Sequence, residues 1–237
     1  MSSHSYANPL AEQVYGRLKE DIFEFRLLPG DHFTETRMAS YYEVSRTPMR
    51  DALYRLQREG FLEVGFRRGW RVRNLDFAYF DDLYDLRIVL EIAAIERICQ
   101  MTTHSQQLLD LKDIWIIPKN EQEKDARVIA RLDENFHTIL VSIPANKQIA
   151  RVHAELTEKI RIIRRLDFTA RNRIEATYQE HAKILKLLLQ RKFIEVSKLL
   201  RSHIEQSKLE VRKITLHRLH EAQSMNFPVH DMVTKGN

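Results

Sequence analysis

The stretch "SRTPMRDALYRLQREGFLEVGFRRGWRVR", residues 45–73, decides how the first part of the chain folds. It holds eight arginines, no lysine and only three acidic residues, so its surplus of positive charge equals the net charge of +5 of the whole chain. A run of charges is most often a solvated helix face with a few ion pairs. The regular spacing of these arginines indicates a more specific role than a solvated face.

The segment "TPMRDALYRLQREG" predicts a helix with marked ends. Thr47 is the expected N-cap, Pro48 the first helical residue, and Gly60 lies just past the end. Arg46 and Arg50 must face away from the core, because the apolar residues share one face. These apolar residues follow the spacing i, i+3, i+4, i+7 and are Met49, Ala52, Leu53 and Leu56.

The flanking segments complete a small domain. Residues 10–27 have a helical apolar period that stops at Pro29-Gly30, and residues 36–43 fit a short helix. After Gly60, "FLEV" and "WRVR" alternate as two short strands around the turn "GFRRG". Helix, short helix, turn "EVSR", longer helix and basic hairpin form the layout of a winged helix-turn-helix, whose second paired helix enters the DNA major groove. Arginine suits that helix, since its planar fork bonds guanine bidentately or grips a phosphate.

At the level of motifs, "VSRTPMRDALYRLQREGFLEV" followed by "RRGWRV" resembles the GntR family of bacterial transcription regulators. The resemblance covers about residues 10–73. It implies that Arg46 and Arg50 are the principal DNA contacts, with Ser45 and Thr47 on phosphate.

The same resemblance extends to the wing. It implies that the tip, Arg68-Gly69, lies in or near the minor groove. Arg67 and Arg71 make this wing more basic than the family pattern, which favours stronger phosphate binding.

The chain changes character near residue 74. Five of the six glycines lie in the first 69 residues, and beyond them we expect helices joined by short polar loops. The fold class is therefore mainly α: a winged helix-turn-helix of three helices and a small β-hairpin wing, then an all-α antiparallel bundle. The expected division is a DNA-binding domain over 8–74, a helical domain over 75–222 and a tail over 223–237. The helical periodicity covers residues 80–101, 106–117, 124–143, 147–166, 174–190 and 193–216.

Composition restricts the class of protein. With 43% hydrophobic and 30% charged residues and no apolar run of membrane-spanning length, the chain is expected to be a globular protein that does not cross a membrane. Its start shows no signal peptide, and the single Cys99 cannot form an internal disulfide. These features predict a location in the reducing cytoplasm.

Three histidines occupy places where a leucine is expected. His181 and His203 each lie on an apolar helical stripe, and His137 follows Asp133 by one helical turn. One such histidine is more often an ordinary core residue than a ligand. Three of them with a carboxylate are costly to bury without partners, and a divalent metal such as zinc, nickel or manganese satisfies all four together.

The second half resembles the FCD type of effector domain, in "DENFH", "EHAKIL" and "LLRSHI", over about residues 76–215. This resemblance implies a metal set of one aspartate and three histidines, matched here by Asp133, His137, His181 and His203. It also implies a pocket for a small organic acid above the metal, with Arg87 meeting a carboxylate. A salt bridge from Arg87 to Glu91 is an equally good reading of that arginine. Asn146 matches a usual family asparagine, whereas His217 and His220 are read as surface residues.

Three functions are compatible with parts of this sequence. The favoured one is a transcription regulator, with repression as the expected mode, that binds an inverted-repeat operator as a homodimer and responds to a small carboxylate effector. A metal-dependent hydrolase is the alternative, because a histidine-bound metal with an open position can activate water. A ligand-binding scaffold without DNA affinity is the third. Neither of these two explains the arginine-rich segment.

Overall fold

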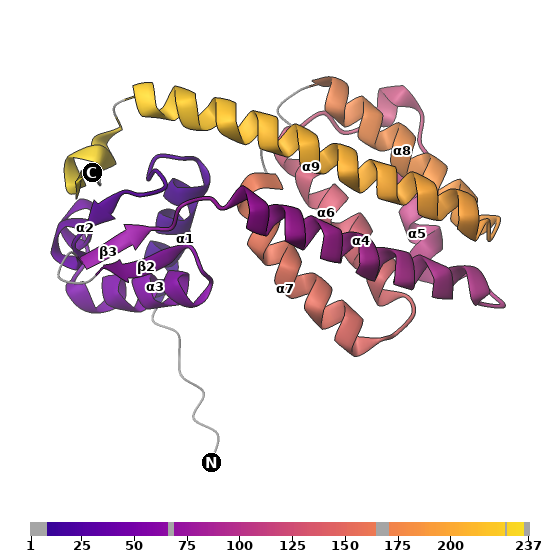
Figure 1. The fold of residues 1–237 in the computed structure, drawn as a ribbon, viewed down its shortest axis with the longest axis horizontal. Coiled ribbons are helices and arrows are strands. Elements are labelled where there is room, and N and C mark those ends of the chain that lie inside the picture. The colour runs from indigo at the N-terminus through magenta and orange to yellow at the C-terminus, as the bar shows by residue number, and fades with distance from the viewer. Residues whose placement is uncertain (1–8, 66–68, 165–170, 226, 235–237) are drawn as a thin grey trace, which may run out of the picture. The chain divides into compact units, whose positions relative to one another are not determined.

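The computed structural model describes residues 9–65, 69–164, 171–225 and 227–234. The chain forms two compact units, one of Met1–Asp76 with Leu216–Asn237 and one of Phe77–Thr215. Its fold is mainly helical, with a winged helix-turn-helix followed by a helical domain, as predicted (Figure 1). The expected division placed a separate tail at residues 223–237, whereas the described residues from Leu216 to Thr234 group with the first unit.

The first unit is built on three helices, α1 (Pro9–Phe23), α2 (Glu35–Tyr41) and α3 (Arg46–Arg58). Helices α1 and α2 both pack against α3. The apolar face predicted for each helix is buried, because it forms the shared core of this unit. The buried residues include Val14, Leu18, Ile22, Met38, Ala39, Tyr42, Met49, Ala52, Leu53 and Leu56.

Two predicted helix ends in this unit are wrong. Helix α3 begins at Arg46, so Ser45 and not Thr47 is the N-cap residue, and its side chain makes no capping hydrogen bond. Pro48 then lies within the first turn, where its missing N–H is one of the groups without an intrahelical partner anyway. Helix α1 ends at Phe23, before Pro29, because Phe25 adopts a left-handed conformation with φ of 54°.

The wing is part of an antiparallel sheet with strand order β2-β3-β1-β4. The predicted hairpin is β2 (Leu62–Gly65) with β3 (Gly69–Val72). Strand β1 (His32–Phe33) pairs with β3, and β4 (Val233–Thr234) pairs with the other edge of β1. Neither of these two-residue strands was predicted from the sequence.

Single residues fix the wing strand β3 and the C-terminal segment in this unit. Gly69 has a φ of +79°, and a Cβ there would lie 2.5 Å from the Phe33 carbonyl oxygen, so a side chain would collide with β1. The 3-10 helix η3 (Pro228–Met232) precedes β4 and packs against α2. Its Val229 is 1% exposed, so the C-terminal segment is anchored in the first unit by an apolar side chain as well as by the strand.

All six helical segments predicted for the second unit are helices. Asp125 caps its helix by accepting hydrogen bonds from the backbone N–H groups of Arg127 and Val128, and Ser105 accepts one from Leu108. None of the described helices is long and apolar enough to cross a membrane. The helices are α4 (Phe77–Gln100), α5 (Gln106–Trp115), α6 (Ala126–Ser142), α7 (Lys147–Arg164), α8 (Arg171–Leu189) and α9 (Phe193–Ser224), with the 3-10 helix η1 (Lys119–Glu121) before α6.

Helix packing brings the predicted histidine positions together. Helix α4 packs against α6 and α7, and α5 packs against α6 and α8. Ion pairs from Lys208 and Arg212 of α9 to Asp85 and Asp81 place α9 beside α4. Residues from α6, α8 and α9 can therefore meet in the interior of this unit.

Candidate functional site

The N-terminus of α3 presents the residues expected to contact DNA. Ser45, Arg46, Thr47 and Arg50 are all exposed, and the two arginine side chains are 62% and 51% exposed. Both guanidinium groups bond the carboxylate of Glu35, at the start of α2. The wing arginines Arg67 and Arg68 lie outside the described residues, and the adjoining Gly69 is required for packing against β1.

Other arginines of the opening stretch stabilise the domain itself. The guanidinium of Arg55 lies 3.6 Å from the centre of the Tyr15 ring and donates to Glu12 at 2.5 Å. Arg71, on β3, donates to Glu63 on β2 at 2.5 Å. The density of arginine therefore has two causes: Arg55 and Arg71 stabilise the unit, whereas Arg46 and Arg50 present exposed guanidinium groups at the start of α3.

The four predicted metal ligands converge in the second unit. Asp133, His137, His181 and His203 are each at most 3% exposed, and one potential ligand atom from each lies within 4.8 Å of all the others. The Nε2 atom of His203 lies 3.3 Å from the Nε2 atoms of both His137 and His181. Asp133 Oδ1 lies 3.4 Å from His181 Nε2 and 3.7 Å from His137 Nε2.

Two of these histidines are oriented by carboxylates behind them. His137 Nδ1 lies 2.6 Å from Glu91 Oε2, and His203 Nδ1 lies 2.6 Å from Glu180 Oε2. Each carboxylate accepts a hydrogen bond from Nδ1–H, which leaves the lone pair on Nε2 directed at the centre of the cluster. This arrangement of carboxylate and imidazole is typical of histidines that bind metal.

His181 is held by aromatic rings. Its ring stacks on Phe136 with centroids 3.8 Å apart and an interplanar angle of 8°, and the edge contact with Trp115 has a centroid distance of 4.2 Å. Its Nδ1 is buried and makes no hydrogen bond among the described residues. Packing, and not a carboxylate, therefore directs Nε2 of His181 toward the cluster.

The protonation states suit a metal. Burial, reinforced by the nearby His203, lowers the pKa of His181 well below its ordinary value, and burial also lowers the pKa of His203. Burial alone would raise the pKa of Asp133, but the Arg164 guanidinium beside it holds that pKa well below its usual range. His181 and His203 are thus held as neutral imidazoles and Asp133 as an ionised carboxylate, the forms that bind a divalent cation.

The distances within the cluster fit a small divalent ion. Four ligand atoms each about 2.0–2.1 Å from a central ion, at the corners of a tetrahedron, are about 3.3–3.4 Å from one another. Of the six separations among the four atoms, 3.3, 3.3 and 3.4 Å match this spacing, a fourth is 3.7 Å, and the other two are no longer than 4.8 Å. Three nitrogens and one oxygen form a donor set suited to zinc, nickel or manganese.

Arg87 forms the predicted salt bridge with Glu91. Its Nε donates to Glu91 Oε1 at 2.6 Å, so the salt bridge is present, and the residue is 1% exposed. Its Nη2 is also buried and makes no hydrogen bond among the described residues. His153 Nε2 lies 3.2 Å from the same Glu91 oxygen. A buried guanidinium with a free donor is a position where a ligand carboxylate can bind.

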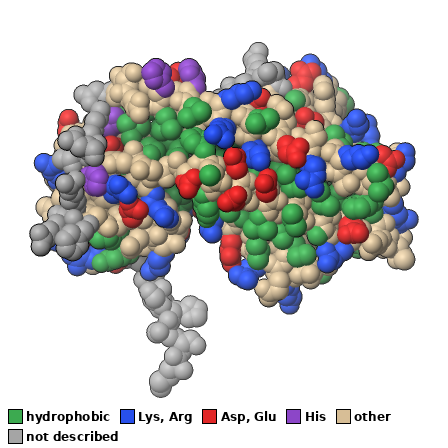
Figure 2. Space-filling view, in the orientation of Figure 1, with side chains coloured by type: hydrophobic (Ala, Val, Ile, Leu, Met, Phe, Trp, Pro, Cys, Tyr) green, Lys and Arg blue, Asp and Glu red, His purple; other side chains and the backbone are tan. Residues whose placement is uncertain are grey.

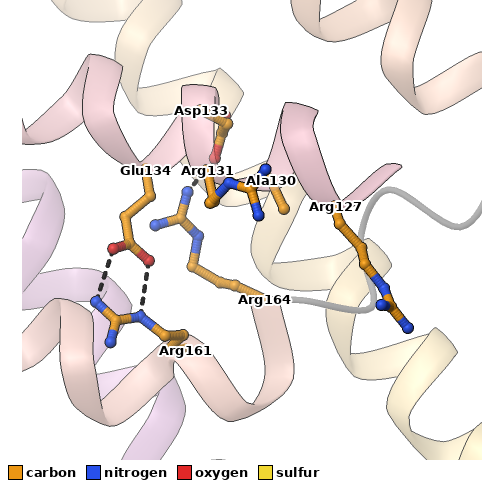
Figure 3. A pocket seen from close by; sticks show the side chains of 7 residues that line it. All are labelled: Arg127, Ala130, Arg131, Asp133, Glu134, Arg161 and Arg164. Carbon is orange, nitrogen blue, oxygen red and sulfur yellow. Dashed lines mark hydrogen bonds and ion pairs between the residues drawn. The ribbon is translucent and has the colours of Figure 1, made fainter. Parts of the chain in front are cut away.

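A cavity of about 460 Å³ adjoins the cluster through Asp133 (Figure 3). Arg161 reaches across it to Glu134, with hydrogen bonds of 2.7 and 3.0 Å, and Arg164 bonds Asp133. Arg127 and Arg131 also line the cavity, and neither forms an ion pair with a described carboxylate. Its lining residues are Arg127, Ala130, Arg131, Asp133, Glu134, Arg161 and Arg164.

Several residues around the cluster were missed from the sequence. Glu180, His153 and Arg164 have no local motif, because each acts on a group far away along the chain. Glu180 directly precedes His181, and that adjacency is the one signal that could have suggested it. Asn146 was noted only as a family position, and in the structure its side chain accepts hydrogen bonds from two backbone N–H groups in the first turn of α7.

A winged helix-turn-helix joined to a helical domain is the architecture of a class of transcriptional regulators. Family models match residues 10–72 as bacterial regulatory proteins of the GntR family and residues 82–206 as an FCD domain. The chain belongs to the GntR family and carries an FCD domain. It is therefore a transcriptional regulator and not an enzyme, which sets aside the hydrolase alternative.

Named relatives and solved structures agree with this assignment. The Nta operon transcriptional regulator of Aminobacter aminovorans is 34% identical, over 77% of this chain and 84% of the relative. The HTH-type transcriptional repressor RspR of Escherichia coli is 27% identical, over 87% and 90%. A solved structure of Lar, which controls expression of the Listeria monocytogenes agr system, has a TM-score of 0.64 at 18% identity, over 87% and 98%. The metal-free FCD domain of TM0439 has a TM-score of 0.52 at 19% identity, over 60% and 98%.

Proposed function

We propose that this regulator is a metal-dependent sensor of a small organic acid that represses transcription from an inverted-repeat operator. The observation that carries the proposal is the convergence of three histidine Nε2 atoms and Asp133 beside an arginine-lined cavity. DNA is contacted by the exposed N-terminus of α3, through Arg46 and Arg50 on bases and Ser45 and Thr47 on phosphate. Arg67, Arg68 and Gly69 of the wing add minor-groove or phosphate contacts.

The charges around the cluster favour an anionic effector. Each nearby carboxylate is paired with an arginine: Glu91 with Arg87, Asp133 with Arg164 and Glu180 with Arg173. Within each pair the positive and negative charges offset each other. A bound divalent cation then adds two positive charges in a buried place, and an acid that coordinates it offsets that charge.

The cavity supports an acid of small size. Its volume of about 460 Å³ lies within the range of small-molecule sites. Arg127 and Arg131 supply positive charge at the cavity, and the free Nη2 of Arg87 is a further carboxylate donor in this unit. Repression is proposed by analogy with RspR, whose name describes it as a repressor.

The proposal includes a homodimer formed through the helical unit. On α4, Tyr79, Leu86 and Val89 are 43%, 40% and 61% exposed, and their spacing of seven and three residues puts them on one helix face. Figure 2 shows hydrophobic side chains over this part of the surface, among acidic ones. A twofold pair presents two α3 helices, as two half-sites require.

The decisive experiment compares His181→Ala with His217→Ala. His217 lies on α9 at 71% side-chain exposure, paired with Glu221, and serves as the matched control. The His181 variant is expected to lose bound metal and the response of operator binding to carboxylates, while basal operator binding persists. The reason is that an effector shifts the DNA-binding equilibrium only if it binds the two arrangements of the protein differently.

The measurements are metal content of the purified protein, thermal shift with a panel of small carboxylates, and fluorescence anisotropy on a duplex selected from a random library. Stoichiometric metal with a normal carboxylate response in His181→Ala would show that these histidines are core residues. If His217→Ala lost metal and the carboxylate response to the same extent, the metal ligands would instead lie toward the C-terminal end of α9.

A further inference from the structure

One carboxylate stands between the two exposed arginines of α3. Glu35 Oε1 accepts hydrogen bonds from Arg46 Nε at 2.9 Å and from Arg50 Nη2 at 3.0 Å. Glu35 Oε2 accepts from Arg50 Nε at 2.9 Å, so Arg50 is bound side-on by both oxygens. The three residues form one hydrogen-bonded group that spans α2 and α3.

Glu35 is itself well fixed. It is the first residue of α2, and the preceding Thr34 caps that helix by accepting from the Arg37 backbone N–H. Its side chain is 14% exposed, although both arginines are more than half exposed. The hydrogen bond from Arg50 is the main cause that lowers the pKa of Glu35, so it is ionised at neutral pH.

The geometry decides which arginine donors remain for DNA. Glu35 occupies the Nε edge of Arg50 and the Nε of Arg46. Nη1 of Arg50 and both Nη groups of Arg46 make no hydrogen bond among the described residues. Long side chains lose rotamer freedom when they bind a base edge, and a carboxylate that already holds them removes part of that cost before DNA arrives.

The net charge of the group formed by Glu35, Arg46 and Arg50 also favours specific over non-specific DNA binding. Two guanidinium groups share one carboxylate, so the group carries one net positive charge instead of two. Sequence-independent affinity depends on the number of phosphates that cations neutralise, whereas base contacts depend on direction. A carboxylate here therefore weakens binding to arbitrary DNA while it orients the arginines for a chosen sequence.

We infer that Glu35 is a positioning residue that sets DNA specificity by holding Arg46 and Arg50 together. This rests on the proposed role of these arginines as base contacts. Glu35→Gln keeps the side-chain shape, but it has one amide oxygen in place of the two carboxylate oxygens that accept hydrogen bonds from Arg46 and Arg50. The operator-to-random affinity ratio is expected to fall about tenfold or more, and the salt dependence on random DNA to steepen by about one unit of slope.

The control is Glu43→Gln, which removes the same charge in the turn before α3 at an exposed residue that bonds neither arginine. It is expected to preserve the affinity ratio. Fluorescence anisotropy on operator and random duplexes, over a range of salt, measures both quantities, and thermal unfolding establishes that each variant is folded. In an Arg50→Ala background, Glu35→Gln is expected to lower the ratio by much less than it does alone, because its action passes through Arg50.

The outcomes separate this inference from the proposed function. A wild-type protein without sequence preference would overturn both. An unchanged ratio in Glu35→Gln, with wild-type preference intact, would overturn the role of Glu35 alone, as would equal behaviour of the two glutamine variants. A switch of preferred base at a single position, with the other positions unchanged, would mean that Glu35 reads a base directly and would also overturn the inference.

Discussion

At the residue scale, the histidine cluster depends on side chains that never reach its centre. Glu180 is half-buried on α8 and bonds Nδ1 of His203, so that Nε2 is free of its proton and directed inward. A glutamine amide is neutral and can donate as well as accept, so it holds the Nδ1–H tautomer of His203 less firmly than the carboxylate does. Glu180→Gln is expected to weaken metal binding about 10- to 100-fold, as is usual when the partner of a metal-binding histidine is lost.

Competition with a fluorescent chelator measures this change. Glu175→Gln is the control, because it removes a carboxylate of the same helix that pairs with Lys119 at the surface and bonds none of the histidines. Metal affinity unchanged in the Glu180 variant would mean that packing alone orients His203, as packing orients His181 against Phe136.

The limits of sequence reasoning also appear at this scale. His137, His181 and His203 could be found because an imidazole on an apolar helical stripe breaks a local pattern. Glu91 and Glu180 could not be assigned as their partners, because a glutamate on a helix is ordinary and only the packing of α4, α6, α8 and α9 brings it to an imidazole. Thr47 was mistaken for the cap of α3 since Ser45 and Thr47 are both good capping residues and differ by two positions.

At the element scale, the C-terminal segment stabilises the first unit. Strand β4 pairs with the free edge of β1, and η3 buries Val229 against the same unit. Val229→Ala removes buried apolar surface and is expected to lower the free energy of unfolding by about 1–3 kcal/mol. Leu216→Ala, at a position that is 52% exposed, is expected to change it by less than about 0.5 kcal/mol.

Chemical denaturation of the two variants tests this difference. Equal stability would mean that the segment rests on the unit without contributing to it. A chain ending at Ser224 is expected to be at least as unstable as Val229→Ala, because it loses the strand pairing together with the valine.

This segment could not be predicted, whereas the helices around it could. Helices α3 and α4 to α9 repeat an apolar stripe over several turns, and repetition makes a periodic pattern recognisable. Strand β4 has two residues, too few to show alternation, and its partner β1 is equally short. Their pairing depends on contact between residues about two hundred positions apart, which no local pattern encodes.

At the scale of the whole molecule, the proposed binding to an inverted repeat requires that two α3 helices be held at the spacing of two half-sites. The face of α4 that carries Tyr79, Leu86 and Val89 is apolar and exposed in the single chain, and α9 lies beside it through the ion pairs with Asp81 and Asp85. Exposed apolar side chains aligned on one helix face are a common basis of self-association.

Val89→Arg is therefore expected to convert a dimer into a monomer at micromolar concentration and to weaken operator binding roughly 100-fold or more, because each chain then binds only one half-site. Sedimentation velocity measures the mass, and anisotropy with operator and half-operator duplexes measures the binding. Ile194→Arg places the same charge at a residue that is 60% exposed in the first turn of α9 and is expected to leave both properties unchanged. A Val89 variant that stays dimeric would place the association surface elsewhere, and a monomer that still binds the full operator like the wild type would remove the need for a dimer.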